Sequence, residues 1–407
     1  MKILHTSDWH LGKRLNERER IAEQVEVMEE IVRIAREERV DAVVVAGDLF
    51  DTYNPPVEAI ELLYRTLYRL ADGGRRLVVA IAGNHDSPDR IDSPDVLARE
   101  CGIFFVGNPM TELKTSVIEG GVSLIEVDRG YAAFRLPGYD YSLRIIHTPY
   151  TNEQRLKRFL GTEDQPARLR EELAGHWREI AERYCDDSGV NLLMAHLFMM
   201  KEGGEMPEEP EDERPINVGG ADAVYSSVIP VAVQYAGLGH LHRYQMIDTF
   251  PCPVIYSGSP LSYSFSEAEQ QKYVVLVKAE PGKVPSIERR VLKSGRPLVR
   301  KRFDGAEEAI RWLRDNPDVW VELTVVTDTY LTGAETKAIY AAHEHIVWLI
   351  PEVKNESATT ARIASIHELR TDVNALFAEY FKNRKGQEPN EELMTLFREV
   401  LAKNKER

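Results

Sequence analysis

The sequence predicts an α/β fold with two sheets, followed by a smaller α/β unit and two C-terminal helices. Three observations support this prediction. In the first two-fifths of the chain, apolar runs typical of strands alternate with amphipathic helical runs. From about residue 115, short strand-like runs follow one another closely, as antiparallel strands do. After residue 296 the alternation of strands and helices begins again over a shorter length.

The first sheet is predicted from four apolar runs, KILHTSD, DAVVVAGD, RLVVAIAGN and IFFVG. Between them, residues 19–38 and 57–71 carry apolar side chains at helical spacing. Continuous apolar strands that alternate with amphipathic helices are typical of a sheet covered by helices.

The second sheet is predicted from VSLIEV, YAAFRL and LRIIHTPY, and then from NLLMAHL, VQYAGLGHLHR, PVIYSGSP and KYVVLVKAE. Two helical stretches, near 152–160 and 166–185, separate the two groups. We assign all of these elements to one domain, residues 1–282. The acidic stretch 203–215, rich in Gly and Pro, is predicted to be an exposed loop.

A second unit is predicted over residues 296–356, in the order strand, helix, strand, helix, strand. Residues 366–383 and 390–404 are predicted to form two helices, separated by KGQEPN. Their apolar stripes are too wide for isolated surface helices. They pack either on a partner or on the chain itself.

The composition is that of a globular protein of two or three domains, with 407 residues, 43% hydrophobic and 29% charged. No apolar run reaches the roughly 18 residues of a membrane span, and the first apolar stretch is too short for a signal peptide. The three cysteines are scattered, as in a reduced cytoplasmic protein. We therefore expect a cytoplasmic protein without a membrane partner.

The net charge of −15 argues weakly against a protein that coats nucleic acid with basic surface. Residues 283–302 are an exception, since they hold eight Lys or Arg and a single acidic residue, Glu288. This stretch lines a nucleic-acid path or forms a solvated linker, and the sequence leaves both open.

Five of the apolar strands of residues 1–282 end in side chains of the types that bind metal ions. The positions, in chain order, are Asp8, His10, Asp48, Asn84, His85, Asp86, His196, His240 and His242. In sheets of this kind, ligands bind where the strands end. Carboxylate, imidazole and amide oxygen together favour Mn²⁺, Fe²⁺ or Zn²⁺, and the absence of cysteine ligands argues against a structural zinc site.

The pair His240 and His242 is open to two interpretations. In a strand, residues two apart point to the same face, so the two imidazoles are expected side by side. Taken alone, the pair is also compatible with one core histidine and one exposed histidine. Beside the other strand ends it fits two ions about 3.5–4 Å apart, bridged by a carboxylate, with one imidazole on each ion.

The ordered pattern DxH, GD, GNHD, H and GHxH resembles that of the calcineurin-like metallophosphoesterases. More narrowly, HTSDWHLG, VVVAGDLFDT, GNHDS, GLGHLHR and YSGSPLSYSFSE are similar to the SbcD family, the nuclease subunits of bacterial SbcCD complexes. VWVELTVVTDTYL and the C-terminal helices extend this similarity over nearly the whole chain. The resemblance implies a calcineurin-like two-sheet core flanked by helices and a capping domain at 296–356. It also implies that the helices within residues 366–407 bind an SbcC-type ATPase.

The resemblance further implies two divalent ions, expected to be Mn²⁺, and a role for each residue. One ion would be held by Asp8, His10 and His242, the other by Asn84, His196 and His240, with Asp48 as the bridge. His85 would not be a ligand but would face the scissile phosphate and protonate the leaving oxygen or stabilise its charge, and Asp86 would orient His85. Two positions depart from the pattern: Asp51 stands where some relatives have a second active-site histidine, and Ala195 where relatives commonly have Gly.

The function implied is a metal-dependent DNA nuclease that cuts double-stranded ends, single strands and hairpins in DNA repair, as a homodimer with its ATPase. One alternative is a small-substrate phosphodiesterase with the same two-metal site. Another is a non-catalytic scaffold for the ATPase. The capping domain and C-terminal helices, which a small-substrate enzyme does not need, favour the nuclease, and the complete set of site residues disfavours the scaffold.

Overall fold

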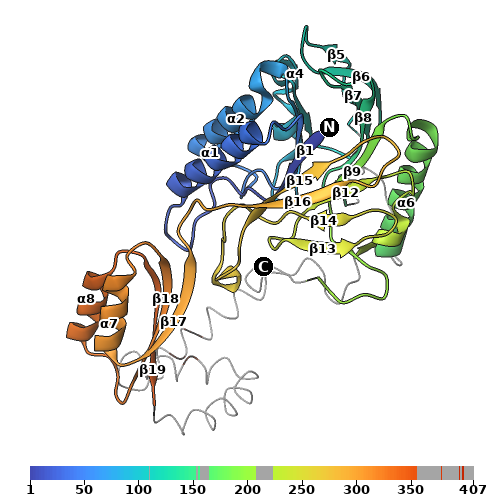
Figure 1. Ribbon diagram of the computed structural model, residues 1–407. Coiled ribbons are helices and arrows are strands. Elements are labelled where there is room, and N and C mark those ends of the chain that lie inside the picture. Colours follow the sequence, from blue (N-terminus) through green and yellow to red (C-terminus); the bar gives the residue numbers. More distant parts are fainter. Residues whose placement is uncertain are drawn as a thin grey trace. The chain divides into compact units, whose positions relative to one another are not determined.

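The computed structural model describes residues 1–109, 111–152, 155, 165–207 and 223–354, together with residues 377, 394 and 397 (Figure 1). The chain forms two compact units. The first comprises Met1–Lys301, Asn316–Glu322 and His345–Trp348, and the second comprises Arg302–Asp315, Leu323–Glu344 and Leu349–Arg407. No helix of the described residues is both long enough and apolar enough to cross a bilayer.

The first sheet has the strand order β16-β15-β1-β2-β3-β4. Its parallel part consists of β1 (Lys2–Thr6), β2 (Ala42–Ala46), β3 (Leu77–Ile81) and β4 (Ile103–Val106). The strands β15 (Tyr273–Lys278) and β16 (Ser286–Val291) extend it in antiparallel fashion beside β1. All residues of β2, β3 and β4 are buried, as the continuous apolar runs predict.

Helices cover one face of this sheet. In Figure 1, α1 (Ile21–Glu37) and α2 (Val57–Ala71) lie together beside it. Val27 and Ile31 of α1 and Leu63 of α2 share one apolar cluster with Val43 and Val45 of β2. The short helix η1 (Asp72–Gly74) lies between α2 and β3, and α3 (Pro88–Asp92) and α4 (Asp95–Arg99) lie between β3 and β4.

The second sheet has the order β13-β14-β12-β9-β8-β7-β6-β5. The strands β5 (Ser116–Val117), β6 (Ser123–Asp128), β7 (Tyr131–Arg135) and β8 (Ser142–Thr148) form an antiparallel meander. Next to β8, the strands β9 (Val190–His196), β12 (Tyr235–Gly239) and β14 (Val254–Tyr256) are parallel, and β13 (Gln245–Asp248) closes the edge in antiparallel fashion.

The two sheets pack face to face over one core. Val44 and Val79 of the first sheet share an apolar cluster with Ile145 and Leu192 of the second. The helix α6 (Gln165–Tyr184) covers the other face of the second sheet, where Trp177 donates a hydrogen bond to Thr148 at 2.8 Å. The remaining short elements are β10 (Met199–Met200), β11 (Val224–Tyr225), η2 (Ser226–Val228) and η3 (Phe265–Glu267). The predicted two-sheet α/β fold is therefore confirmed.

The predicted order of elements after residue 296 is also observed. It reads β17 (Leu298–Asp304), α7 (Ala306–Asp315), β18 (Trp320–Thr327), α8 (Gly333–Ala342) and β19 (Ile346–Val353), and the three strands form one sheet in the order β17-β18-β19. A capping box between Thr332 and Glu335 begins α8.

Some predicted elements lie outside the described residues. They are the helix near 152–160 apart from residue 155, the part of the acidic loop after residue 207, and the C-terminal helices apart from residues 377, 394 and 397, which are helical.

One buried carboxylate holds the start of α1. Glu23 is 3% exposed and pairs with both Nε and Nη2 of Arg20 at 2.9 Å. The Trp320 indole and the Arg296 amide also donate to it, at 2.9 and 2.8 Å. Although burial acts to raise the pKa of Glu23, the Arg20 guanidinium and these donors hold it below its usual value.

We predict that Glu23→Ala lowers the free energy of unfolding by about 3–5 kcal/mol, because it leaves Arg20 buried without a counter-charge. Urea denaturation measures this loss. As a control, Glu37→Ala removes an exposed ion pair to Arg33 and should cost less than about 1 kcal/mol. Equal, small losses in the two variants would contradict this role of Glu23.

A buried histidine predicts a pH effect on stability. His147 of β8 is 1% exposed, and neither ring nitrogen has a hydrogen-bond partner in the described part of the chain. Burial lowers the pKa of His147 to about 4. In the unfolded chain, His147 therefore takes up a proton near its ordinary pKa of 6.5, whereas in the folded chain it does not. This difference lowers the free energy of unfolding as the pH falls from 6.5 to 4.

His147→Leu should consequently lose less stability than the wild type over this range, by about 1 kcal/mol or more. Urea titrations at a series of pH values would show the two stability curves converging toward neutral pH. Curves that stay parallel from pH 6.5 to 4 would show that His147 contributes nothing to the acid sensitivity.

Candidate active site and metal centre

The strand ends of both sheets bring the predicted site residues together. Asp8 and His10 follow β1, Asp48 follows β2, and Asn84 and His85 follow β3. From the second sheet, His196 ends β9, and His240 and His242 follow β12. Parallel strands direct their carboxyl ends to the same edge of a sheet, and here two such edges meet. All eight predicted residues lie in this one place.

The prediction for His240 and His242 was wrong in one respect. We expected both in a strand, on one face. The strand β12 instead ends at Gly239, and both histidines lie in the loop that follows. His240 has a φ of 117°, a conformation that side-chain-bearing residues rarely adopt. The two imidazoles consequently point to different partners.

Strained backbone occurs at the other strand ends as well. Asp8, His10 and Asp48 have φ values of 53°, 43° and 46°. Backbone hydrogen bonds hold these turns together, from the Asp8 amide to Gly47 O at 2.9 Å and from the His10 amide to Asp48 O at 3.0 Å. Such conformations cost energy and cluster at functional sites, where the surrounding structure enforces them.

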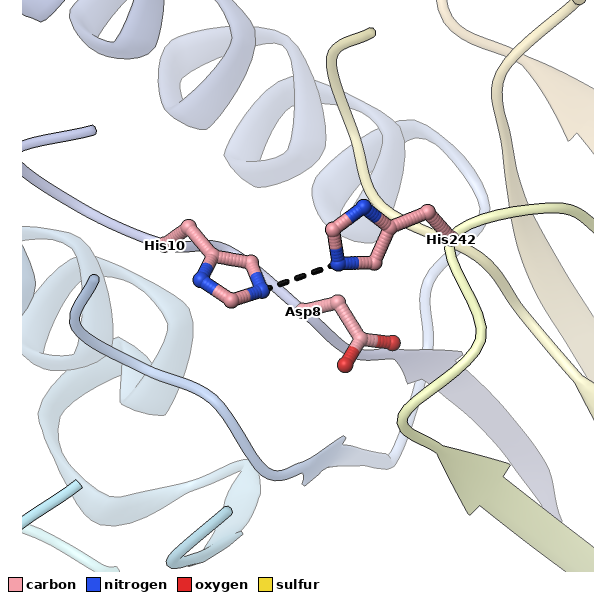
Figure 2. A group of neighbouring side chains, drawn as sticks. All are labelled: Asp8, His10 and His242. Carbon is pink, nitrogen blue, oxygen red and sulfur yellow. Dashed lines mark hydrogen bonds between the residues drawn. The ribbon is translucent and has the colours of Figure 1, made fainter. Parts of the chain in front are cut away.

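One group of ligand atoms is formed by Asp8, His10 and His242 (Figure 2). All three side chains are buried, and one ligand atom from each lies within 4.8 Å of the other two. Figure 2 shows the two imidazoles facing each other next to the Asp8 carboxylate, with their Nε2 atoms 3.0 Å apart. Two nitrogen lone pairs and a carboxylate that converge in this way suit a divalent cation.

A second group lies beside the first. The Asn84 side-chain oxygen is 2.9 Å from His196 Nε2 and 3.2 Å from His240 Nδ1. His196 Nδ1 donates to the Ala46 carbonyl at 2.9 Å, so in the neutral ring Nε2 carries the lone pair and faces this group. Amide oxygen and two imidazoles are again metal-ligand types, so the chemistry of both donor sets fits a metal ion.

Asp48 lies between the two groups. Its Oδ2 atom is 3.4 Å from His196 Nε2 and 3.6 Å from His10 Nε2. Its other oxygen accepts a hydrogen bond from the His85 amide at 2.8 Å. One oxygen is thus fixed to the backbone while the other faces both sets of imidazoles.

The buried charges compensate one another. Burial raises the pKa of Asp8 to about 6. Burial also acts to raise the pKa of Asp48, but the neighbouring His196, His10 and His85 hold it well below its usual value. Burial acts in turn to lower the pKa of His196, yet Asp48 and Asp8 raise it to about 9. Buried carboxylates need positive partners, which a divalent cation would supply.

A backbone carbonyl sets the orientation of His85. Its ring Nδ1 donates to the Asp51 carbonyl at 2.8 Å, so Nε2 is the atom available to a substrate. The Asp51 side chain lies 3.5 Å from His10 Nδ1 and 3.2 Å from Lys13 Nζ. Asp51, which stands where some relatives have a second histidine, therefore lies beside the ring nitrogen of His10 that does not face His242.

Asp86 contacts backbone rather than the His85 ring. Its carboxylate accepts hydrogen bonds from the Leu49, Phe50 and Gly83 amides at 2.8–3.0 Å. It thereby ties the loop after β3 to the loop after β2, and any effect on His85 passes through the backbone.

The sequence did not reveal three buried side chains around the site. Arg155 donates to the Gly83 and Asp86 carbonyls at 2.8 and 2.9 Å and so clamps the loop that carries His85. Glu267 contacts the Nδ1 atom of the His242 ring, and Lys272 donates a hydrogen bond to the His242 carbonyl. Glu267 stands in the quoted run YSGSPLSYSFSE, but its spacing from the other site residues gives no signal of a contact.

The chain is similar to known proteins over most of its length. Residues 1–197 match the family model described as calcineurin-like phosphoesterase. The chain is 35% identical to the D component of the nuclease SbcCD from Bacillus subtilis, over 99% of this chain and 98% of that protein. It is 29% identical to the protein of the same name from Escherichia coli K12, over 96% of this chain and 94% of that protein.

Among solved structures, a dimetal phosphatase from Danio rerio is 13% identical, with a TM-score of 0.39, and the match covers 72% of this chain and 97% of that one. The similarity to the nuclease subunits extends over almost the full length of both chains. The chain therefore belongs to the SbcD family, the nuclease subunits of SbcCD complexes, and its residues 1–197 match the calcineurin-like phosphoesterase model.

Proposed function

We propose that this chain is a metal-dependent nuclease that hydrolyses phosphodiester bonds in DNA, as the catalytic subunit of a complex with an SbcC-type ATPase. The observation that carries the proposal is the position of Asp48, whose Oδ2 faces His10 on one side and His196 on the other at 3.4–3.6 Å. Full-length similarity to SbcD proteins favours DNA over a small substrate.

Two divalent ions, preferably Mn²⁺, would be held here. Asp8, His10 and His242 would hold one, Asn84, His196 and His240 the other, and Asp48 would bridge them. When bound, such a pair supplies Lewis acidity to the phosphodiester and makes hydroxide available near neutral pH. The residues behind the ligands fix which nitrogen each imidazole presents, as the Ala46 carbonyl does for His196.

His85 would supply the proton for the leaving oxygen. Hydroxide adds to phosphorus while the bond to the departing sugar oxygen breaks. The protonated His85 ring gives its Nε2 proton to that oxygen and keeps the Nδ1 proton, which the Asp51 carbonyl holds. Partial exposure of His85 is consistent with access to a substrate.

The basic stretch 283–302 is partly paired with acidic residues of the chain itself. Ion pairs with acidic residues involve Lys283, Arg290, Arg296, Arg300 and Arg302. Five of its eight basic side chains are therefore paired within the chain, which weighs against the nucleic-acid path. The alternative of a solvated linker is wrong for much of the stretch, because Ser286–Val291 form β16 and Leu298–Asp304 form β17.

We also propose the two protein contacts that the resemblance implies. The C-terminal helices would bind the ATPase; their Phe377 and Phe397 rings stack on each other, with centroids 3.9 Å apart. A homodimer contact on α2 is supported by the exposure of Val57, Tyr64 and Tyr68. Action in the cytoplasm, near the nucleoid, follows from the proposed substrate.

Removing the bridging carboxylate should leave the site unable to hold a second ion. We expect Asp48→Ala to retain its fold, because His196, unlike a buried arginine, can give up its proton when this carboxylate is removed, and to lose measurable binding of the second Mn²⁺ equivalent. Isothermal titration with Mn²⁺ measures this, and wild-type stoichiometry in the variant would contradict the bridging role.

His85→Ala should bind Mn²⁺ as the wild type does but cleave an end-labelled DNA hairpin about 10²–10⁴-fold more slowly, because the leaving oxygen loses its proton donor. His176→Ala, in α6, serves as the matched control with unchanged cleavage. Cleavage by His85→Ala at the wild-type rate would refute the role.

If the wild-type chain alone does not cleave the hairpin, the assay is repeated with the ATPase present. A complete complex that cuts no DNA, while the chain hydrolyses a chromogenic phosphodiester, would replace the nuclease with a small-substrate phosphodiesterase.

A further inference from the structure

A buried carboxylate lies directly behind His242. Glu267 is 1% exposed, and its Oε1 atom is 3.4 Å from His242 Nδ1. The same oxygen accepts the Tyr263 amide at 3.0 Å, which fixes the carboxylate in place. Because a carboxylate only accepts hydrogen bonds, the shared proton belongs to Nδ1 of the imidazole.

Lys272 holds both partners of this contact. Its ammonium group pairs with Glu267 Oε2, and it donates to the His242 carbonyl and to Ser259 Oγ, the latter two at 3.0 Å. The side chain is only 9% exposed. One ammonium thus uses its three donors to connect the backbone of His242 with the carboxylate that faces its ring.

The proton on Nδ1 determines what the other nitrogen can do. With Nδ1 protonated, a neutral His242 has a lone pair on Nε2, and this atom is 3.0 Å from His10 Nε2 beside Asp8. A carboxylate partner also increases the basicity of the imidazole as a metal ligand. At His196, in contrast, the neutral Ala46 carbonyl accepts from Nδ1.

We infer that Glu267, held by Lys272, is a positioning residue that fixes the tautomer and ring orientation of His242 for metal binding. The inference rests on the proposed metal role of His242. A purely structural alternative is a buried ion pair that closes the segment from Ser259 to Lys272. That alternative explains the pair of charges but not the alignment of a carboxylate oxygen with His242 Nδ1.

Glu267→Gln tests the inference, because the amide has nearly the same shape but can donate to Nδ1 as well as accept from it. We expect Mn²⁺ affinity at one of the two equivalents to fall about 10–100-fold in isothermal titration, with a smaller change at the other. Nitrogen NMR of the metal-free chain should show that His242 no longer occupies a single tautomer. Its signals are identified by their loss in His242→Ala.

Two further variants separate positioning from folding. Glu30→Gln changes a buried carboxylate of α1 that accepts the Lys293 and Ser294 amides, and it should leave Mn²⁺ affinity unchanged. Glu267→Gln combined with Lys272→Met removes both charges, so it leaves no unpaired ammonium. Thermal unfolding without metal verifies that each variant is folded.

The double variant decides the matter if the single one is unstable. Weakened Mn²⁺ binding in the folded double variant supports the inference. Wild-type affinity in the double variant would overturn it, since Glu267 would then serve only to neutralise Lys272. A wild-type chain that binds no Mn²⁺ would instead refute the proposed metal centre itself.

Discussion

The close approach of two strand ends from different sheets is the constraint on which the site depends. A Cβ atom on Gly239, at the end of β12, would lie 1.8 Å from the carbonyl oxygen of Ala46, at the end of β2. One on Gly47 would lie 2.1 Å from His196 Nδ1. Only residues without side chains allow this contact. It brings the carboxylates of the first sheet against the imidazoles of the second, which neither sheet could assemble alone.

The approach buries charged groups, and the structure offsets their cost with paired interactions. Asp8 accepts the His240 amide at 2.9 Å, and Asp48 accepts the His85 amide at 2.8 Å, so each loop is tied to a carboxylate from another strand end. The left-handed backbone at Asp8, His10 and Asp48 is held by the hydrogen bonds from the Asp8 amide to Gly47 O and from the His10 amide to Asp48 O. This frame would hold the same side chains in place for the proposed ions.

The sequence could predict features that depend on residues close together in the chain, but not contacts between distant segments. The candidate site residues were predictable because they follow apolar strands at short, recognisable spacing. The loop conformation of His240 was not, because a periodic pattern does not show where a strand gives way to a strained turn. Nor did the sequence show that KYVVLVKAE pairs with β1, or that Glu267 faces His242, because both contacts join segments far apart in the chain.

The central claim is that the strand ends of both sheets form one centre for two adjacent ions bridged by Asp48. Electron paramagnetic resonance of the Mn²⁺-loaded chain tests it most directly. Two ions about 3.5–4 Å apart through a shared carboxylate should give the spectrum of an exchange-coupled pair. That spectrum should disappear in Asp48→Ala. Two magnetically isolated ions in the wild type would contradict the account.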